Sequence, residues 1–386
     1  MTTTITNEHK KLNVPNLRFP EFQGEWKEST IGEMFDLYSG NTPSRLNKEH
    51  FKGTVNWISS GELKEHYIYS SKEQISEEAA KSLKLLPVGT FVIAIYGLEA
   101  EGVRGTGSII QEPSTISQAC MSFIPKGVIE NEFLYSWYKK HGNVIGIRYA
   151  QGTKQQNLSY DILEKFKIAY PNTKEQEKLN KFISLLDECI ATQNKIIEDL
   201  KKLKCAIAER LFKVTNGEVV ALSEVCNIQK GKQVNGDCLS ETGTYYVMNG
   251  GTEPSGYYEQ CNAPADTISI SEGGNSCGYV QYNRDAFWSG GHCYTLTDIQ
   301  SNVCNLYLYH YLKSKESTIM KLRIGTGLPN IQKKDLEKFA VLLPPVVKQV
   351  RISTFLTAIE RKTTNEEILL SHFQEEKQYL LRQMFI

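Results

Sequence analysis

The chain has 386 residues, enough for two or three domains with apolar cores, and its 44 basic and 44 acidic residues balance. That balance argues against a disordered tail or a general polyanion binder. The nine cysteines contain no Cys-x-x-Cys pair, which argues against a disulfide framework and a zinc site and predicts a cytoplasmic protein with reduced thiols. No apolar run reaches membrane-spanning length, which argues against a membrane protein.

The first predicted elements belong to a region that is rich in strand signals. TVNWISS (54–60) and GTFVIAIYG (89–97) are β-branched or aromatic runs bounded by Gly, Asn and Ser, which is typical of strands and turns. NEFLYSWYKKHG (131–142) has the apolar face of a short helix. We therefore expect a mixed, β-rich domain over residues 1–172.

A long helix is predicted next, over residues 173–214. Pro171 ends the preceding extended segment, and Gly217 provides a helix stop. Apolar residues in between recur at alternating three- and four-residue steps, which is the a/d pattern of a coiled-coil helix. We name these positions the helix-pair seam, and in this helix they are Leu179, Phe182, Leu186, Ile196, Leu200 and Leu203.

The same order returns in the second half of the chain. TYYVMNG (244–250) and DTISISEGG (266–274) have strand signals, and VCNLYLYHYLKS (303–314) has those of a short helix, so a second mixed domain is expected over residues 215–345. A second long helix is predicted over residues 346–386, with the seam residues Ile352, Phe355, Ile359, Leu369 and Phe373. Two such helices in one chain favour mutual pairing, although the alternative is that each packs on its own domain.

An internal repeat accounts for this order. GTKQQNLSYDILEKF (152–166) returns without a gap as GTGLPNIQKKDLEKF (325–339). Shifting the sequence by the same interval also matches Pro171 with Pro344, Gln176 with Gln349, and Phe212 with Phe385. The first half carries extra length between positions 40 and 117. The chain is therefore two related units in succession, each a globular part followed by a helix.

No catalytic constellation accompanies the repeat. GLEAEGVRGTG (97–107) lacks the Lys-Ser/Thr ending of a phosphate loop and the spacing of a dinucleotide fingerprint. The sequence has neither the Asn/Asp-Pro-Pro-Tyr motif of amino-methyltransferases nor the Pro-Asp…Glu-x-Lys pattern of many nucleases. His292 beside Cys293 is a weak signal for a nucleophile, since such neighbours usually only pack. We therefore predict neither an enzyme nor a metal site.

The stretch VPNLRFPEFQGEWKESTIGEMFDLYSG, the glycine-led turn before Asn157, and the repeated LEKF-proline-helix element resemble the specificity subunit of type I restriction–modification systems. The resemblance covers nearly the whole chain. It implies an α+β fold: two β-rich target-recognition domains separated by two long helices that pair as an antiparallel coiled coil, in a pseudo-twofold internal repeat. Each domain would read one half of a split, asymmetric target in double-stranded DNA, and the helices would fix the gap between the halves.

The resemblance also implies partners. Two methylation subunits, which carry S-adenosylmethionine, and restriction subunits, which use ATP and Mg²⁺, would assemble around this chain, which would itself hold no cofactor. The charge is unusual for this role, because residues 1–172 contain 19 basic and 19 acidic residues and residues 215–345 contain 10 and 13. The alternative is a two-headed adaptor or scaffold whose domains bind proteins.

Base reading requires short polar or forked side chains on loops that enter a groove. In the first domain the candidates are Asn41, Thr42, Ser44, Arg45, Ser59, Ser60, Lys64, Arg104, Thr106, Gln151, Thr153, Lys154, Gln155 and Gln156. In the second domain they are Lys230, Lys232, Gln233, Asn249, Asn275, Ser289, His292, Thr326 and Asn330. Arg45 is suited to a bidentate guanine contact, and the glutamines to adenine. For the repeated Gly-Thr and Asn, the alternative is that they only build a turn.

Overall fold

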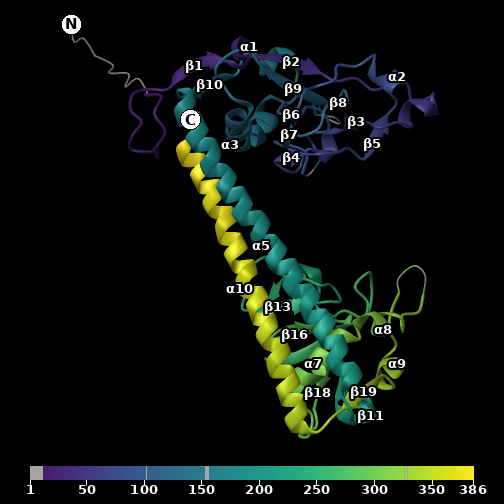
Figure 1. Ribbon diagram of the computed structural model, residues 1–386. Coiled ribbons are helices and arrows are strands. Elements are labelled where there is room, and N and C mark those ends of the chain that lie inside the picture. Colours follow the sequence, from purple (N-terminus) through teal and green to yellow (C-terminus); the bar gives the residue numbers. More distant parts are fainter. Residues whose placement is uncertain (1–11, 101, 153–155, 326, 328) are drawn as a thin grey trace. The chain divides into compact units, whose positions relative to one another are not determined.

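The computed structural model describes residues 12–100, 102–152, 156–325, 327 and 329–386 (Figure 1). The chain forms two units: unit 1 comprises Met1–Thr192 and Leu370–Ile386, and unit 2 comprises Gln193–Leu369. The long helices are α5 (Thr173–Val214) and α10 (Val346–Met384). The units divide inside these two helices, so each unit contains one globular domain and a part of both helices.

The globular part of unit 1 is a set of small sheets covered by a helix. Its elements are β1 (Lys27–Thr30), α1 (Ile31–Met34), β2 (Phe35–Ser39), β3 (Val55–Ile58), β4 (Tyr67–Ile68), β5 (Glu73–Ile75), α2 (Glu77–Ala80), β6 (Phe91–Ala94), β7 (Gly107–Ile110), β8 (Ser114–Ile116), β9 (Cys120–Pro125), α3 (Asn131–Tyr149), α4 (Tyr160–Leu163) and β10 (Lys167–Tyr170), with 3-10 turns at Lys48–Phe51 and Ser60–Glu62. The strand orders are β2-β9-β6-β7-β4, β5-β3-β8 and β1-β10. Strand β6 is buried along its whole length, and α3 packs on it through Tyr138 against Phe91.

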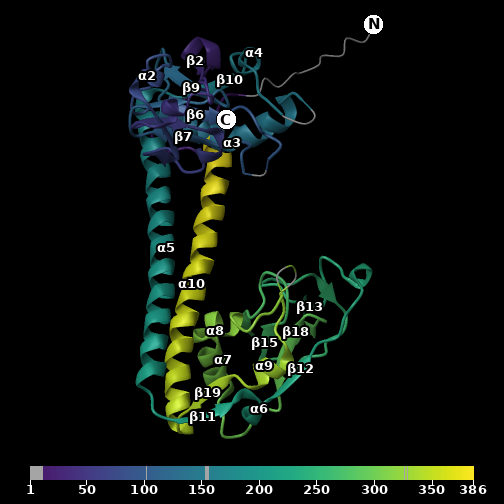
Figure 2. The ribbon, with the colours of Figure 1, turned by 90° about the vertical axis from the view of Figure 1, so that its right-hand side faces the viewer.

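Unit 2 repeats this arrangement. Its elements are β11 (Glu218–Ala221), α6 (Leu222–Val225), β12 (Asn227–Lys230), β13 (Tyr245–Met248), β14 (Tyr257–Tyr258), β15 (Thr267–Ser271), β16 (Val280–Asn283), β17 (Trp288–Ser289), β18 (Cys293–Thr297), α7 (Asn305–Ser314), α8 (Glu316–Met320), α9 (Lys333–Glu337) and β19 (Ala340–Leu343), with a 3-10 turn at Gly236–Cys238. The strand orders are β12-β18-β15-β16, β14-β13-β17 and β11-β19. Helix α7 lies between this sheet and the long helices (Figure 2). Its Tyr307 packs edge-on against Phe212 of α5.

Strand order is shared by the two units. The series β2-β9-β6-β7 of unit 1 corresponds to β12-β18-β15-β16 of unit 2, and β5-β3-β8 corresponds to β14-β13-β17. Unit 1 adds β4 beside β7, within the stretch where the first repeat is longer. The repeat in the sequence is therefore a repeat of topology, and side chains in the two units can be compared position by position.

A buried glutamine fixes the start of each long helix. The Gln176 amide donates to the carbonyls of Pro171 and Val128, both at 3.0 Å, and its oxygen accepts from the Glu130 N–H. Gln349, the repeat equivalent, makes the matching bonds to Pro344, Asn302 and Cys304. In both repeats these bonds tie a buried glutamine side chain to backbone groups of the preceding loops, so the repeated glutamine has a structural role.

The repeated glycine and asparagine build a turn. Gly152 has φ 105° and Gly325 has φ 95°, a backbone region that favours glycine. In each repeat the residue before this glycine forms a β-bridge with the asparagine, Asn157 or Asn330. The backbone roles of Gly and Asn therefore explain their recurrence, whereas the intervening Thr153 and Thr326 lie outside the described residues.

The long helices pair in antiparallel fashion, and the predicted seam is partly wrong. Within unit 2, Gln193 of α5 contacts Glu366 of α10, while Lys204, further along α5, contacts the earlier residue Glu360. Four predicted seam residues are exposed to solvent: Ile196 by 40%, Leu203 by 50%, Phe355 by 51% and Leu369 by 39%. Leu179 and Ile352 are buried, and the half-buried members are Phe182, Leu186, Leu200, Ile359 and Phe373.

Some buried residues of the helix pair differ from the predicted seam residues. The buried residue beside exposed Ile196 is Ile197, the one beside exposed Phe355 is Leu356, and the one beside half-buried Phe182 is Ile183. Each lies one residue after the position that the heptad pattern suggested. Polar residues such as Gln193 and Glu366 also occupy buried seam positions. The predicted alternation of three and four residues agrees with the structure, but three of the predicted positions, Phe182, Ile196 and Phe355, lie one residue before the buried one.

Candidate nucleic-acid interface

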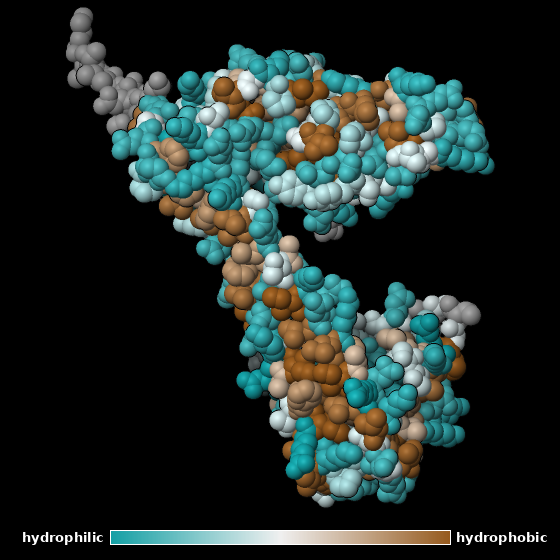
Figure 3. Space-filling view, viewed as in Figure 1, coloured by the Kyte–Doolittle hydropathy of each residue, from teal (hydrophilic) through white to brown (hydrophobic). Residues whose placement is uncertain are grey.

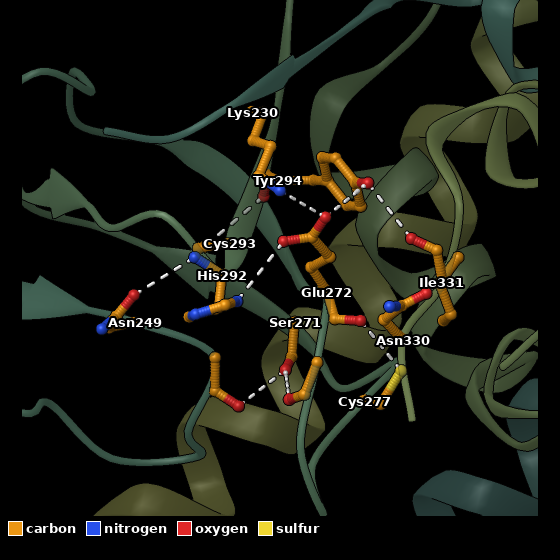
Figure 4. A network of polar contacts seen from close by, with 12 residues as sticks. Lys230, Asn249, Ser271, Glu272, Cys277, His292, Cys293, Tyr294, Asn330 and Ile331 are labelled. Atoms are coloured by element: carbon orange, nitrogen blue, oxygen red, sulfur yellow. Dashed lines mark hydrogen bonds and ion pairs between the residues drawn. The ribbon is translucent and has the colours of Figure 1, made fainter. Parts of the chain in front are cut away.

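A cavity of about 600 Å³ opens at one edge of the main sheet of unit 2. Its lining combines glycine backbone with polar side chains, among them Asn275 and, labelled in Figure 4, Lys230, Asn249, Glu272, His292 and Asn330. Five of these six were candidate DNA contacts in the sequence: Lys230, Asn249, Asn275, His292 and Asn330. The fold thus brings together loop residues that are up to 100 positions apart in the chain.

Strand ends position these side chains. Lys230 is the last residue of β12 and pairs with Tyr294 of β18, while His292 directly precedes β18. Glu272 directly follows β15, the strand on the other side of β18. Because β12 and β15 both pair with β18 antiparallel, the C-terminal ends of β12 and β15 lie at the same edge as the N-terminal end of β18. Three charged or ionisable side chains therefore converge from neighbouring strands.

Glu272 is the centre of this cluster. It is 8% exposed, and its Oε1 accepts from Lys230 Nζ at 2.6 Å and from Tyr294 Oη at 3.0 Å. Burial, and then the neighbouring charge of Glu272, raise the pKa of the Tyr294 phenol above its ordinary value, so the phenol remains a donor. Oε2 of Glu272 has no hydrogen-bond partner among the described residues, and His292 Nδ1 lies 3.6 Å from it.

The loops around the cavity are held open by backbone bonds and glycines. Asn249 Oδ1 accepts from the His292 N–H at 3.2 Å, and Ser271 Oγ donates to the Gly250 carbonyl at 2.6 Å. Gly250 has φ 85°, and a Cβ there would lie 3.0 Å from the His292 carbonyl oxygen. A larger residue at this position would be strained and would crowd the loop, so glycine keeps the cavity accessible.

The other candidates in unit 2 lie elsewhere. Ser289 is 2% exposed and its hydroxyl donates to the Cys293 carbonyl, so it is bonded within the fold. Lys232 and Gln233 are exposed on the loop after β12 and do not line the cavity.

Among the described residues of unit 1, several candidates have partners within the fold. Arg45 already donates to both carboxylate oxygens of Glu73, at 2.9 and 2.7 Å, and its guanidinium lies 4.5 Å from the Phe51 ring centroid. A bidentate guanine contact would require this ion pair to break. Thr42 N–H donates to Asn41 Oδ1, so the Asn41 side chain helps to shape the same loop, on which Ser44 is exposed.

Several further candidates in unit 1 are engaged in local structure. Ser59 donates to Glu62 Oε2 at 2.6 Å, and Thr106 donates to the Val103 carbonyl. Arg104 Nη2 donates to Gln156 Oε1 at 3.1 Å, although Arg104 Nε is buried with no partner among the described residues. Of the rest, Ser60 is half-buried, Lys64 and Gln151 are exposed, and Lys154 and Gln155 lie outside the described residues.

Sequence reasoning missed Glu272 and Tyr294. The available signal was the acidic residue that ends the strand pattern TISIS in DTISISEGG, directly before two glycines. An acidic side chain at the end of a buried strand and beside flexible backbone is uncommon unless it has a partner. Among the described residues, no group of three or more His, Cys, Asp and Glu side chains is placed to hold a metal ion. None of the described helices is both long and apolar enough to cross a membrane.

Two domains of shared strand order, each followed by a long helix, define a class of protein. Comparison with known proteins identifies this class. The family described as the type I restriction modification DNA specificity domain matches residues 23–202 and again residues 215–371. The chain belongs to this family, and it is a DNA specificity subunit of the type I class, not an enzyme. The resemblance seen in the sequence is thereby confirmed, and the alternative of a protein-binding adaptor is not favoured.

Individual relatives agree with this assignment. The type I restriction enzyme MjaIX specificity subunit of Methanocaldococcus jannaschii is 24% identical, over 83% of this chain and 83% of its own. The EcoR124I/EcoR124II specificity subunit of Escherichia coli is 32% identical over 48% of this chain and 46% of its own. The crystal structure of the type I S subunit from M. genitalium, 19% identical, covers 97% of this chain and 99% of its own with a TM-score of 0.64, which confirms the fold.

Proposed function

We propose that each unit reads one half of a bipartite, asymmetric target in double-stranded DNA, and that the chain thereby directs adenine methylation and restriction by partner subunits. The observation that supports this proposal is a shared strand order with different side chains at the equivalent sheet edge, where unit 2 has Lys230, Glu272 and His292 and unit 1 has Ser39, Ile95 and Ala119. A common scaffold that presents different donors and acceptors suits two unlike half-sites, because base identity is read from the pattern of these groups.

Charge supports an assembly in which partners share the DNA contacts. The globular regions have no basic surplus, with 19 basic and 19 acidic residues in 1–172 and 10 and 13 in 215–345. Neutralisation of phosphates by Lys and Arg supplies most of the sequence-independent affinity for DNA. We expect the isolated chain to bind DNA weakly and the complex to bind it tightly.

The paired helices offer a docking surface for two methylation subunits. In unit 2 the exposed apolar residues on α5 and α10 include Ile196, Leu203, Phe355, Ile368 and Leu369, and Figure 3 shows apolar surface along these helices. Exposed apolar patches of this kind commonly mark protein interfaces. Restriction subunits would join the same assembly, with S-adenosylmethionine and ATP/Mg²⁺ bound by the partners and the whole complex in the cytoplasm.

A domain exchange tests the proposal. Residues 1–172 are replaced with the same region of a relative of known target, and methylated sites are mapped across a genome that carries the methylation partner. We expect one half of the target to change while the other half and the gap stay the same. The reciprocal exchange of residues 215–345 should change the other half. A single exchange that altered both halves would refute independent reading.

A further inference from the structure

The polar cluster around Glu272 is replaced by small or apolar residues at the equivalent described positions of unit 1. The Glu272 N–H donates to the His292 carbonyl at 2.9 Å, and in unit 1 the Ile95 N–H donates to the Ala119 carbonyl at 2.9 Å. In unit 2 the acceptor His292 directly precedes β18, which pairs with β15. In unit 1 the acceptor Ala119 directly precedes β9, which pairs with β6. Ile95 therefore stands where unit 2 has Glu272, and Ala119 stands where unit 2 has His292.

The neighbouring strand pair differs in the same way. Lys230 pairs with Tyr294 on β12 and β18, whereas Ser39 pairs with Met121 on the corresponding β2 and β9. Unit 1 thus completes the same sheet edge with small or apolar residues. The fold itself does not require a carboxylate, an ammonium group and a phenol at this edge.

Glu272 is, moreover, incompletely satisfied. Its side chain is buried at the base of the cavity, Oε1 has two donors, and Oε2 has none among the described residues. A buried carboxylate oxygen without a hydrogen bond is unfavourable, and the isoleucine of unit 1 avoids that penalty. An unused acceptor at the base of an open cavity is suited to an N–H donor from a ligand.

Base edges in the DNA major groove provide such donors, namely the amino groups of cytosine and adenine. In a C·G pair the cytosine amino group lies beside the guanine O6 and N7 acceptors, which matches a carboxylate next to an ammonium group. Lys230 Nζ binds Oε1 with one of its three donors, and its side chain is 52% exposed, so further donors face outward. Adenine fits less well, because its N7 acceptor lies beside the amino group and would face the carboxylate.

We propose that Glu272 Oε2 accepts a hydrogen bond from the N4 amino group of a cytosine while Lys230 donates to the paired guanine, so that unit 2 reads a C·G pair at one position of its half-site. This proposal rests on the proposed function of the chain. His292 covers Oε2 and has a 63% exposed side chain, so its ring has room to move aside when the base edge enters. Gly250, Gly251, Gly273 and Gly274 at the rim allow close approach of the DNA.

The test uses the full chain in complex with its methylation partner and a DNA library with randomised half-sites, scored by methylation. The variants are Glu272→Gln, which adds donor character, and Glu272→Ile, which introduces the residue of unit 1. Glu241→Gln, an exposed carboxylate away from the cavity, is the matched control. We expect the wild type and the control to require C·G at one position, and both Glu272 variants to lose about tenfold or more of that discrimination. All other positions should keep their preferences.

The possible outcomes separate the two proposals. Wild-type complex without any bipartite target would refute the proposed function, and this inference with it. A bipartite target that is unchanged in both Glu272 variants, or an affected position at which the wild type prefers a pair other than C·G, would refute the inference alone. Thermal unfolding of each variant is measured in parallel. If both Glu272 variants fail to fold, the carboxylate is structural and the inference is wrong.

Discussion

Gln193 of α5 donates through Nε2 to the side chain of Glu366 of α10 and, at 3.1 Å, to its backbone carbonyl. The two residues occupy the same position in the two repeats, at the interval that relates Gly152 to Gly325. Both are buried, 6% and 8% exposed. A position that meets its own repeat equivalent fixes the register of an antiparallel helix pair, because any slip along the helices would separate the buried Gln193 amide from Glu366, which, among the described residues, would keep only its ion pair with Lys362 of the same helix.

Two ion pairs between α5 and α10 are also related to each other by the repeat. In unit 1, Asp187 of α5 binds Lys377 of α10, and in unit 2, Lys204 of α5 binds Glu360 of α10 at 2.9 Å. Asp187 and Glu360 are repeat equivalents, as are Lys204 and Lys377. The same interaction is therefore made twice, with the roles of the helices exchanged.

The first prediction concerns the central polar pair. Gln193→Leu should lower the free energy of unfolding, because Glu366 loses the donor from α5 and, among the described residues, keeps only its ion pair with Lys362. The double variant Gln193→Leu/Glu366→Leu should recover most of this loss, since an apolar pair leaves no polar group unsatisfied. Urea unfolding of the full chain measures both effects. A double variant that is less stable than the single one would show that the polar pair stabilises the helices in its own right.

A second prediction tests the corrected seam with two adjacent isoleucines. Ile197 is 7% exposed and Ile196 is 40% exposed. Ile197→Ala should lower the free energy of unfolding by about 2–4 kcal/mol through lost burial and a residual cavity. Ile196→Ala should change it by no more than about 0.5 kcal/mol, as expected at an exposed position. Equal losses in the two variants, measured by urea unfolding, would contradict the seam described here.

A third prediction separates folding from assembly. Leu203 is 50% exposed on α5, and Leu203→Glu places a charge in the proposed docking surface without burying it in the helix pair. We expect an unchanged melting temperature but at least about tenfold weaker binding of the methylation subunit in a pull-down titration. Lys195→Glu, at another exposed position of the same helix, serves as the control and should bind normally. Normal binding by Leu203→Glu would mean that this part of α5 is not the docking surface.

The fourth prediction concerns pH. His66 in unit 1 lies between the rings of Tyr67 and Tyr135, with Nε2 2.9 Å from Glu132 and Nδ1 3.3 Å from Asp187. Burial opposes its positive charge, but the hydrogen bonds and charges of the two carboxylates prevail and raise the pKa of His66 above its ordinary value. Because the folded state holds the proton more tightly, this stabilisation is complete below the unfolded pKa of about 6.5 and disappears as the pH rises through the folded pKa.

The comparison of wild type with His66→Gln isolates this effect. The difference in melting temperature should be largest near pH 6 and should shrink as the pH is raised toward 7.5. The other charged groups near this site are Glu65, Lys377 and Lys139, and burial, with the charge of Lys377 adding to it, lowers the pKa of Lys139 to about 8. Its titration contributes with the opposite sign, but mainly at higher pH. A difference that is independent of pH would show that His66 is not charged in the folded protein.

Much of the fold can be predicted from the sequence, because the sequence signals for helix starts and for the repeat are local. Pro171 before a run without Gly or Pro marks the start of α5, and the shared LEKF element identifies the repeat. Five polar residues on glycine-rich loops, Lys230, Asn249, Asn275, His292 and Asn330, were also identified as site candidates, since short polar side chains beside flexible backbone are uncommon in a core. The candidates in unit 1 were less successful, because Arg45 and Ser59 have partners within the fold, Glu73 and Glu62, that spacing does not reveal.

The sequence by itself determined the order of domains and helices and the family, because these depend on periodicity, composition and an internal repeat. Only the tertiary structure decided the phase of the seam. Ile196 and Ile197 are equally apolar, so the choice between them depends on the approach angle of the partner helix. The spacing alone places the polar residue Gln193 at a seam position, but only the structure shows that Glu366 lies opposite it. The role of Glu272 is likewise visible only in the structure, where neighbouring strands bring Lys230, Tyr294 and His292 around its carboxylate. The role of a carboxylate depends on its neighbours, and these neighbours are distant in the sequence.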